Sequence, residues 1–143
     1  MRLAAAAARL VTAGSLATGG GLAIAEGLAV ASLAVGATAP RLTVTAPGHT
    51  PKIKTHWNYT VSVSEGGKPV AAKLTEQIVD PIGGVHAVQV GPTTKNITNM
   101  PIKGTYRDYI IWPADSRGIP LTFRVTVKVG QVTKVVNYHV TAH

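Results

Sequence analysis

The feature that most restricts the fold of this chain is a strict alternation of apolar and polar residues near its C-terminus. Between residues 121 and 129 every second residue is apolar, and those between them are Thr, Arg or Lys. A second run follows from 132 to 141 after Gly130-Gln131. Because alternation with period two places one set of side chains on one face, we expect two antiparallel strands joined by a two-residue turn.

The turn also predicts the register of this hairpin. On the inner face it pairs Val129 with Val132, Val125 with Val136, and Phe123 with Tyr138. On the outer face it sets Arg124 opposite Asn137 and Lys128 opposite Thr133. Lys134 departs from the pattern, since it falls on the inner side opposite Val127, where its aliphatic stem can still reach water at the sheet end.

Similar alternation predicts strands through the rest of the chain after Pro40. The expected strands span 41–45, 57–64, 69–79, 85–90, 103–112, 121–129 and 132–141, with a polar loop at 91–101 and a turn-rich loop at 113–118. About seven short strands separated by turn signals indicate an all-β antiparallel sandwich.

Three stretches carry a resemblance to a known family. They are Trp57-x-Tyr59-x-Val61-x-Val63, Gly67-Lys68-Pro69-Val70 and Leu121-x-Phe123-x-Val125. The layout resembles a bacterial immunoglobulin-like or fibronectin type III-like module over residues 41–141. The immunoglobulin Cys pair is missing, which favours the cysteine-free relatives. This resemblance implies an immunoglobulin-like β-sandwich with an adhesive, spacing or scaffolding role, although such a fold hosts many functions.

Composition changes abruptly at Ala39/Pro40. The 39 residues before the change include 14 Ala and 6 Gly, and every Pro, His and aromatic residue comes after it. Arg2 and Arg9, the apolar stretch 10–24 and a small-residue cleavage signal together predict a signal peptide at 1–39 and a folded domain at 40–143. Pro40 hinders cleavage after Ala39, so a cut after Ala37 is an equal alternative.

An uncleaved membrane anchor helix is the other interpretation of residues 1–39, since the apolar stretch is long enough to span a bilayer. Glu26 in its middle and the absence of a following cluster of Lys or Arg argue against it. We therefore expect a secreted or envelope-associated protein exported by the general secretory route, with membrane contact through this segment if it stays uncleaved. The Ala- and Gly-rich leader suggests a bacterial source.

The domain is basic and has no cysteine. Residues 40–143 contain 12 Lys and Arg against 5 Asp and Glu, a balance that favours contact with polyanions. We expect an anionic cell-envelope polymer as partner, without specific nucleic-acid binding. The predicted contact residues are Arg124 and Lys128 on the outer face of the last hairpin, and Lys52 and Lys54, which are expected to alternate on a strand. Equally, a high pI can serve solubility alone.

A protein partner is the alternative: an accessory subunit or chaperone could offer a sheet edge for strand addition. A weaker alternative is a metal-binding sandwich that uses His49, His56 or His139. No H-x-H or H-x-x-H pair and no Cys is present, so we expect no metal and no cofactor.

Catalytic candidates are few, and we expect a protein that is not an enzyme. Ser116 lies in a loop with the composition of a plain turn. Asp108 shares the core-facing parity of its strand, so it must be paired, with Arg107, Arg117 or Arg124 as candidates. Tyr109 is expected on the outer face, and a single exposed Tyr makes no carbohydrate platform.

Overall fold

The computed structural model describes Gly36 and residues 38–143. The predicted signal or anchor segment therefore lies almost wholly outside the described residues. Within them, no helix has the length and apolar character needed to cross a membrane.

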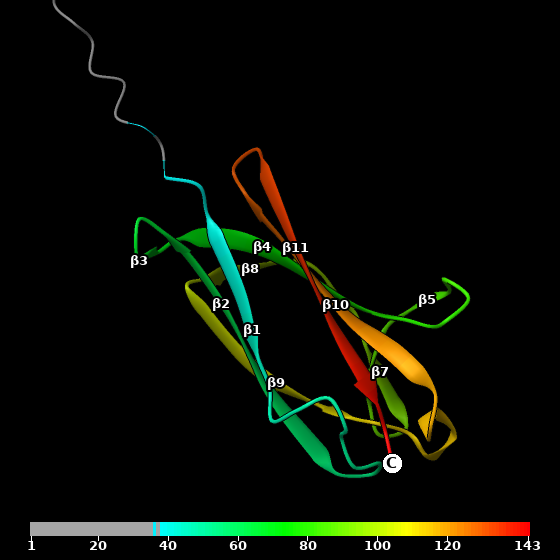
Figure 1. Ribbon diagram of the computed structural model, residues 1–143. Helices are drawn as coiled ribbons and strands as arrows, with labels where there is room; N and C mark the ends of the chain where they lie inside the picture. Colours follow the sequence, from blue (N-terminus) through cyan, green and yellow to red (C-terminus); the bar gives the residue numbers. More distant parts are fainter. Residues whose placement is uncertain (1–35, 37) are drawn as a thin grey trace, which may run out of the picture. The chain divides into compact units, whose positions relative to one another are not determined.

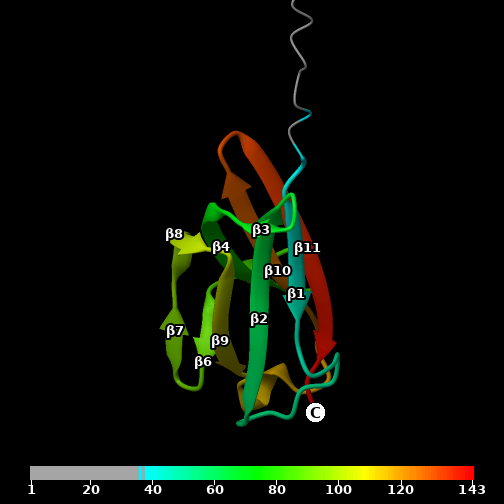
Figure 2. The same ribbon diagram turned by 90° about the vertical axis from the view of Figure 1, so that its left-hand side faces the viewer.

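Two β-sheets pack face to face in this domain (Figures 1 and 2). Sheet A has the order β1-β2-β9-β6-β7, with β3 also paired to β2. Its strands are β1 (Arg41–Thr45), β2 (His56–Glu65), β3 (Lys68–Pro69), β6 (Val88–Val90), β7 (Thr93–Lys95) and β9 (Thr105–Ile111). Sheet B has the order β11-β10-β4-β5, with β8 also paired to β4. Its strands are β4 (Ala71–Val79), β5 (Val85–His86), β8 (Ile97–Lys103), β10 (Pro120–Val129) and β11 (Val132–Thr141). The all-β sandwich expected from the sequence is confirmed.

The C-terminal hairpin has the predicted register throughout. Val129 pairs with Val132, Phe123 with Tyr138, and Arg124 with Asn137, as the two-residue turn requires. Gly130 in this turn has φ 56°, a left-handed conformation that suits glycine. Lys134 is partly exposed opposite the buried Val127, which agrees with its expected place on the inner side near the sheet end.

Two predicted strands are wrong in their extent. The strand expected at 69–79 divides into β3 in sheet A and β4 in sheet B, and the one expected at 85–90 divides into β5 and β6. The loop expected at 91–101 instead contains β7 and most of β8. The strands in this segment are held by backbone hydrogen bonds, and a pattern of apolar and polar side chains gives no information about such bonds.

Two of the crossings between the sheets meet at one corner of the sandwich. The chain passes from sheet A to sheet B at Val70, and it returns from sheet B to sheet A at Gly104. The Gly104 N–H donates to the Val70 carbonyl at 3.0 Å, while the Gly104 carbonyl accepts from Val63 N at 2.7 Å. Gly104 has φ 73°, and a Cβ there would lie 2.7 Å from Pro69 Cβ. Glycine is therefore required where the two crossings touch.

Aromatic rings fill the centre of the core between the sheets. Trp57 on β2 is 3% exposed and packs edge-to-face against Trp112, Phe123 and Tyr138. Its Nε1 donates to the Gly48 carbonyl at 3.1 Å, so the buried polar atom is satisfied. Trp57 of sheet A thus packs against Phe123 and Tyr138 of sheet B, and these contacts join the two sheets.

Candidate functional site

Basic side chains gather on the outer face of sheet B. Arg124 and Lys128 lie on β10, Lys73 on β4 and Lys103 on β8. Lys128 is the direct register partner of Lys73, and partners across a ladder project to the same side of a sheet. Lys103 is the partner of Ala71, on the same side. We call Lys73, Lys103, Arg124 and Lys128 the basic face.

A shallow groove of about 670 Å³ lies at one end of the basic face. Lys73 and Lys128 line it together with Asn99 and Pro101 from β8. Asn99 has φ 51°, and its N–H donates to Thr75 Oγ1 at 3.0 Å where the β4–β8 register shifts. Such a bulge re-aims the strand locally, at the point where Asn99 lines the groove beside the two lysines.

Among the described residues, no acidic group balances the basic face. Asp80 is bonded to His86 and Asp108 is paired with Lys95, both away from this surface. The acid of β4, Glu76, is only 3% exposed and belongs to the inner side. Like charges directly opposite each other on a sheet destabilise it, so the Lys73–Lys128 pair has a cost that a bound anion would offset.

The spacing of the cations suits an extended ligand. Arg124 and Lys128 are four residues apart on one strand, which corresponds to about 13 Å, and Lys73 lies one strand away, at about 5 Å. Arg124 Nε also donates to Asn137 Oδ1 at 3.3 Å, which holds its guanidinium on the outer face. A linear polymer with several anionic groups can contact all of these positions at once.

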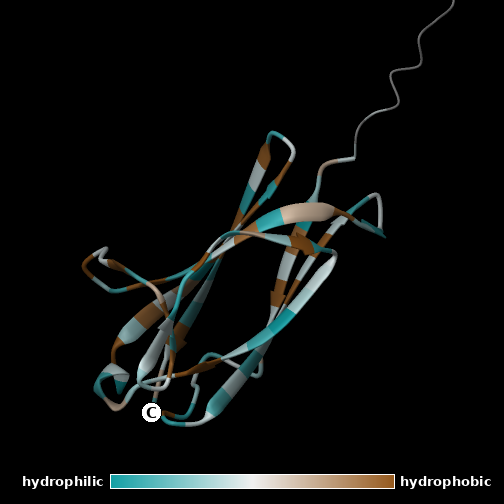
Figure 3. Cartoon of the chain, turned by 180° about the vertical axis from the view of Figure 1, so that it is seen from behind, coloured by the Kyte–Doolittle hydropathy of each residue, from teal (hydrophilic) through white to brown (hydrophobic). Residues whose placement is uncertain are grey.

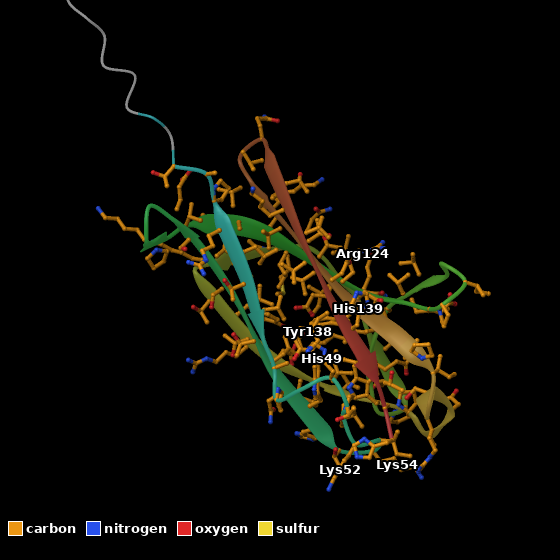
Figure 4. The ribbon with its side chains drawn as sticks, viewed as in Figure 1. His49, Lys52, Lys54, Arg124, Tyr138 and His139 are labelled. Carbon is orange, nitrogen blue, oxygen red and sulfur yellow. The ribbon has the colours of Figure 1, made fainter. Side chains whose placement is uncertain are left out.

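Lys52 and Lys54 do not join this surface. The expectation that they alternate on a strand is wrong, because they lie in a turn before β2 and Lys54 has φ 57°. Its N–H donates to the Trp112 carbonyl at 2.9 Å, and this tie fixes the turn. Figure 4 shows both lysines at the end of the sandwich away from Arg124. The predicted basic residues therefore form two separate groups.

The three histidines considered as metal ligands, His49, His56 and His139, are engaged in side-chain contacts. His49 hydrogen-bonds to the His139 carbonyl at 2.6 Å and stacks on Tyr138 with ring centroids 4.5 Å apart (Figure 4). His56 stacks on Tyr109 at 4.1 Å, so this half-buried Tyr is not a free platform. Residues 36 and 38–143 contain no group of three or more His, Cys, Asp or Glu side chains able to hold a metal.

The predicted role of Asp108 as a paired carboxylate is confirmed, but its partner was missed. Asp108 pairs with Lys95 and accepts hydrogen bonds from Tyr106 Oη at 2.5 Å and Tyr109 N at 2.9 Å. Burial alone would raise its pKa, yet these hydrogen bonds hold the pKa below its usual value. Lys95 lies on β7, inside the segment expected to be a loop, so sequence reasoning had no register that could bring it near.

Ser116 forms part of a turn, as predicted. Its Oγ donates to the Pro113 carbonyl at 2.6 Å, and the side chain is buried within the 3₁₀ turn Ala114–Ser116. The hydroxyl is thus committed to the backbone rather than to a base of the kind that nucleophilic catalysis needs.

A buried polar pair joins the two sheets inside the core. Tyr59 Oη on β2 donates to Glu76 Oε2 on β4 at 2.5 Å. Burial raises the pKa of Glu76 to about 7, and the Tyr59 hydrogen bond only partly opposes this shift. Burial, followed by the charge of Glu76, also raises the pKa of Tyr59. The pair is closed to solvent, so it acts on stability rather than on a ligand.

The sheet edges carry the protections that natural edge strands show. β8 contains Pro101, β7 ends at Lys95, and Lys134 lies on β11. The C-terminal end of β11 is covered further, since Thr141 N and His143 N donate to carbonyls of His49 and Pro51. β1 also runs beside β11 (Figure 2). The edges within residues 38–143 thus give no specific support to strand addition.

Sequence reasoning also missed Lys73 and Lys103. Lys73 has the parity opposite to Leu74 on a predicted strand, which could have placed it on an outer face. Its position beside Lys128 depends on the β4–β10 pairing, which joins segments about 50 residues apart. Nothing in the local pattern predicts that pairing.

Comparisons with known proteins show little likeness. No family model matches the chain, and no curated protein matches it. One solved structure, a DUF4466 family protein from Parabacteroides merdae, aligns with a TM-score of 0.41 and 16% identity. The alignment covers 75% of this chain and 44% of that one.

Proposed function

We propose that this chain is an exported, non-enzymatic binding module that holds an anionic polymer of the cell envelope on its basic face. The observation that supports this most strongly is the Lys73–Lys128 register pair. It concentrates two positive charges beside a groove, and the one acid in the described strands of sheet B, Glu76, is buried. A surface of this kind attracts a polyanion by long-range steering and by release of counterions.

Export rests on the predicted leader, whose basic start, apolar stretch and small-residue end fit a secretory signal. The domain contains no cysteine, so its folding does not depend on the redox state of the compartment. We infer that it works outside the cytoplasm, where wall polymers and anionic lipids are abundant.

The immunoglobulin-like classification is part of this proposal. The order β1-β2-β9-β6 in one sheet and β11-β10-β4 in the other corresponds to the ABED and GFC sheets of that architecture. One departure is that β6 joins β9 in parallel through a single pair, Val90 with Ile111. The aromatic centre of the core also comes from Trp57 on the second strand, whereas antibody domains place their Trp on the third.

The direct test uses poly(glycerol phosphate) as the probe and the uncharged polysaccharide dextran as the control. The full 143-residue chain should bind the first and not the second, with affinity falling on the order of 10- to 100-fold between about 50 and 200 mM salt. The double variant Lys73→Gln/Lys128→Gln should lose most of this binding. Equal binding of the wild type and this variant would overturn the proposal.

A matched control comes from the chain itself. Lys52→Gln/Lys54→Gln removes the same number of charges from the turn before β2. If net charge alone drove binding, this variant and the basic-face variant would weaken it equally. We expect the turn variant to keep most of its affinity.

A further inference from the structure

We propose that a cavity between the β4–β5 hairpin and the 3₁₀ turn is a second binding site, which takes a small organic cation with a compact apolar body. The cavity measures about 240 Å³. It involves neither the basic face nor the groove beside it, and its charge is of the opposite sign.

Core residues form the apolar part of the cavity. Ile78 and Trp112 are 5% and 2% exposed and belong to the hydrophobic core, and Leu121 packs against that core. Because interiors are densely packed, such a wall is largely preformed and costs little to organise when a ligand binds. The lining contains more apolar than polar surface, as small-molecule sites commonly do.

Exposed apolar side chains gather around this end of the domain. The β4–β5 hairpin carries Ile82, 94% exposed, and Val85, 50% exposed, and the cavity lining includes Ile119, 39% exposed. Figure 3 shows the hydrophobic colour of this projecting hairpin. These are three of the five large hydrophobic side chains that the described residues expose. Such a concentration is typical of a ligand-binding surface.

The polar part of the cavity is acidic in a chain of net charge +8. Asp80 and Asp115 both line it, and the lining contains one histidine, His86, but no Lys or Arg. Glu76 and Asp108 are committed to the interior. A local negative site on a positive molecule selects for cations and against anions. This charge complementarity identifies the kind of occupant.

Asp80 is held as a fixed carboxylate. Its Oδ1 accepts from Ile82 N at 3.0 Å and Gly84 N at 2.7 Å, while Oδ2 lies 2.9 Å from His86 Nε2. The His86 hydrogen bond, followed by that of Gly84, holds the Asp80 pKa below its usual value. A Cβ on Gly84 would lie 2.3 Å from Asp80 Oδ2, so the turn leaves room for this carboxylate only with glycine there.

Volume limits the size of the ligand. An apolar cavity of about 150 Å³ accommodates benzene, so 240 Å³ suits one ring with a short aminoalkyl arm. The ring would lie against Trp112 and Leu121, and the ammonium would face Asp80 or Asp115. Phenethylamine has these features and serves as the probe.

The experiment is a set of titrations followed by NMR on the ¹⁵N-labelled full chain. Phenethylamine should give saturable shifts at the amides of Ile78, Asp80 and Leu121. Its neutral analogue 2-phenylethanol should bind about tenfold more weakly, and the anion 3-phenylpropionate more weakly still. Equal affinities for the three probes, or shifts spread over the basic face instead, would overturn the assignment.

Two variants test the contribution of the Asp80 charge separately from that of the apolar cavity wall. Asp80→Asn keeps an oxygen for the two turn amides and should weaken phenethylamine about tenfold while changing 2-phenylethanol less than about twofold. Glu65→Gln, which removes an acid outside the cavity, should change neither. If Asp80→Asn and Glu65→Gln weaken phenethylamine binding equally, the assignment of a cation site beside Asp80 is wrong.

A second variant covers the case in which Asp80→Asn disturbs the turn. Ile119→Lys places a positive charge at an exposed position of the lining and leaves the Asp80 turn intact. It should weaken phenethylamine at least as much as Asp80→Asn does, and unchanged affinity would contradict the proposal. Binding of poly(glycerol phosphate) should survive in both variants, so this site and the proposed function can fail independently.

Discussion

Lys128 on β10 lies directly opposite Lys73 on β4, with both side chains on the outer side of sheet B and no acid in register with either. Two residues with this arrangement repel each other in the free protein. The arrangement is therefore easier to understand as a property of a binding surface than of a sheet selected only for stability.

Lys73→Gln should stabilise the fold and weaken polyanion binding at the same time. Removing a like-charge pair across a ladder is expected to raise the free energy of unfolding by about 0.2–0.5 kcal/mol. Urea unfolding at low salt measures this change. Lys52→Gln, in the turn before β2, serves as the control and should leave the unfolding free energy unchanged.

The Tyr59–Glu76 pair should make stability fall as pH rises. Burial raises the pKa of Glu76 from 4.5 to about 7, so the folded state binds more protons than the unfolded state between these values. The stabilisation is complete below pH 4.5 and is lost as pH rises through about 7, by about 3 kcal/mol in total.

Glu76→Gln isolates that effect. Comparing urea unfolding of the two proteins from about pH 5 to pH 8 should show a downward slope for the wild type relative to the variant, since titrations of the histidines cancel in the difference. Parallel curves over this range would mean that Glu76 is ionised throughout and that its burial has no such effect on its pKa.

Gly104→Ala should destabilise the domain more than Gly67→Ala does. Both glycines have positive φ, 73° and 78°, so both substitutions carry a similar backbone cost of about 1–2 kcal/mol. Only at Gly104 would the new Cβ meet Pro69, at 2.7 Å, whereas nothing lies within 4 Å at Gly67. Thermal unfolding measures the difference, and equal losses would show that the corner is not tightly packed.

Leu74→Ala should cost roughly 2–5 kcal/mol of unfolding free energy, because Leu74 is fully buried at the centre of β4. Val135→Ala is the matched control on β11. Its side chain is 52% exposed, so the same measurement should change by less than about 0.5 kcal/mol.

Local pattern predicted the parts of the fold in which neighbouring residues decide the structure. The β10–β11 hairpin is correct to the residue because a two-residue turn leaves only one register that buries Phe123 and Val125 together. The switches of sheet at Val70 and Gly104 were not predicted, because they depend on contacts between segments far apart in the sequence.

The candidate site shows the same division. Alternation alone placed Arg124 and Lys128 correctly on an outer face. Lys52 and Lys54 were wrongly assigned to a strand, because two lysines separated by one residue can equally occur in a turn. Lys73 and the Asp108–Lys95 pair needed the tertiary pairing of strands. The sequence shows which residues are charged, but it does not show which residues lie beside them on the neighbouring strands of a sheet.

The most direct measurement of the central claim is the dependence of poly(glycerol phosphate) affinity on salt. A plot of log affinity against log salt concentration has a slope that reports the number of cations in contact with the polymer, and each cation lost lowers the slope by about one. The account predicts that Lys73→Gln/Lys128→Gln lowers the slope by about two and that Lys52→Gln/Lys54→Gln leaves it unchanged. Equal slopes for the wild type and the basic-face variant would contradict it.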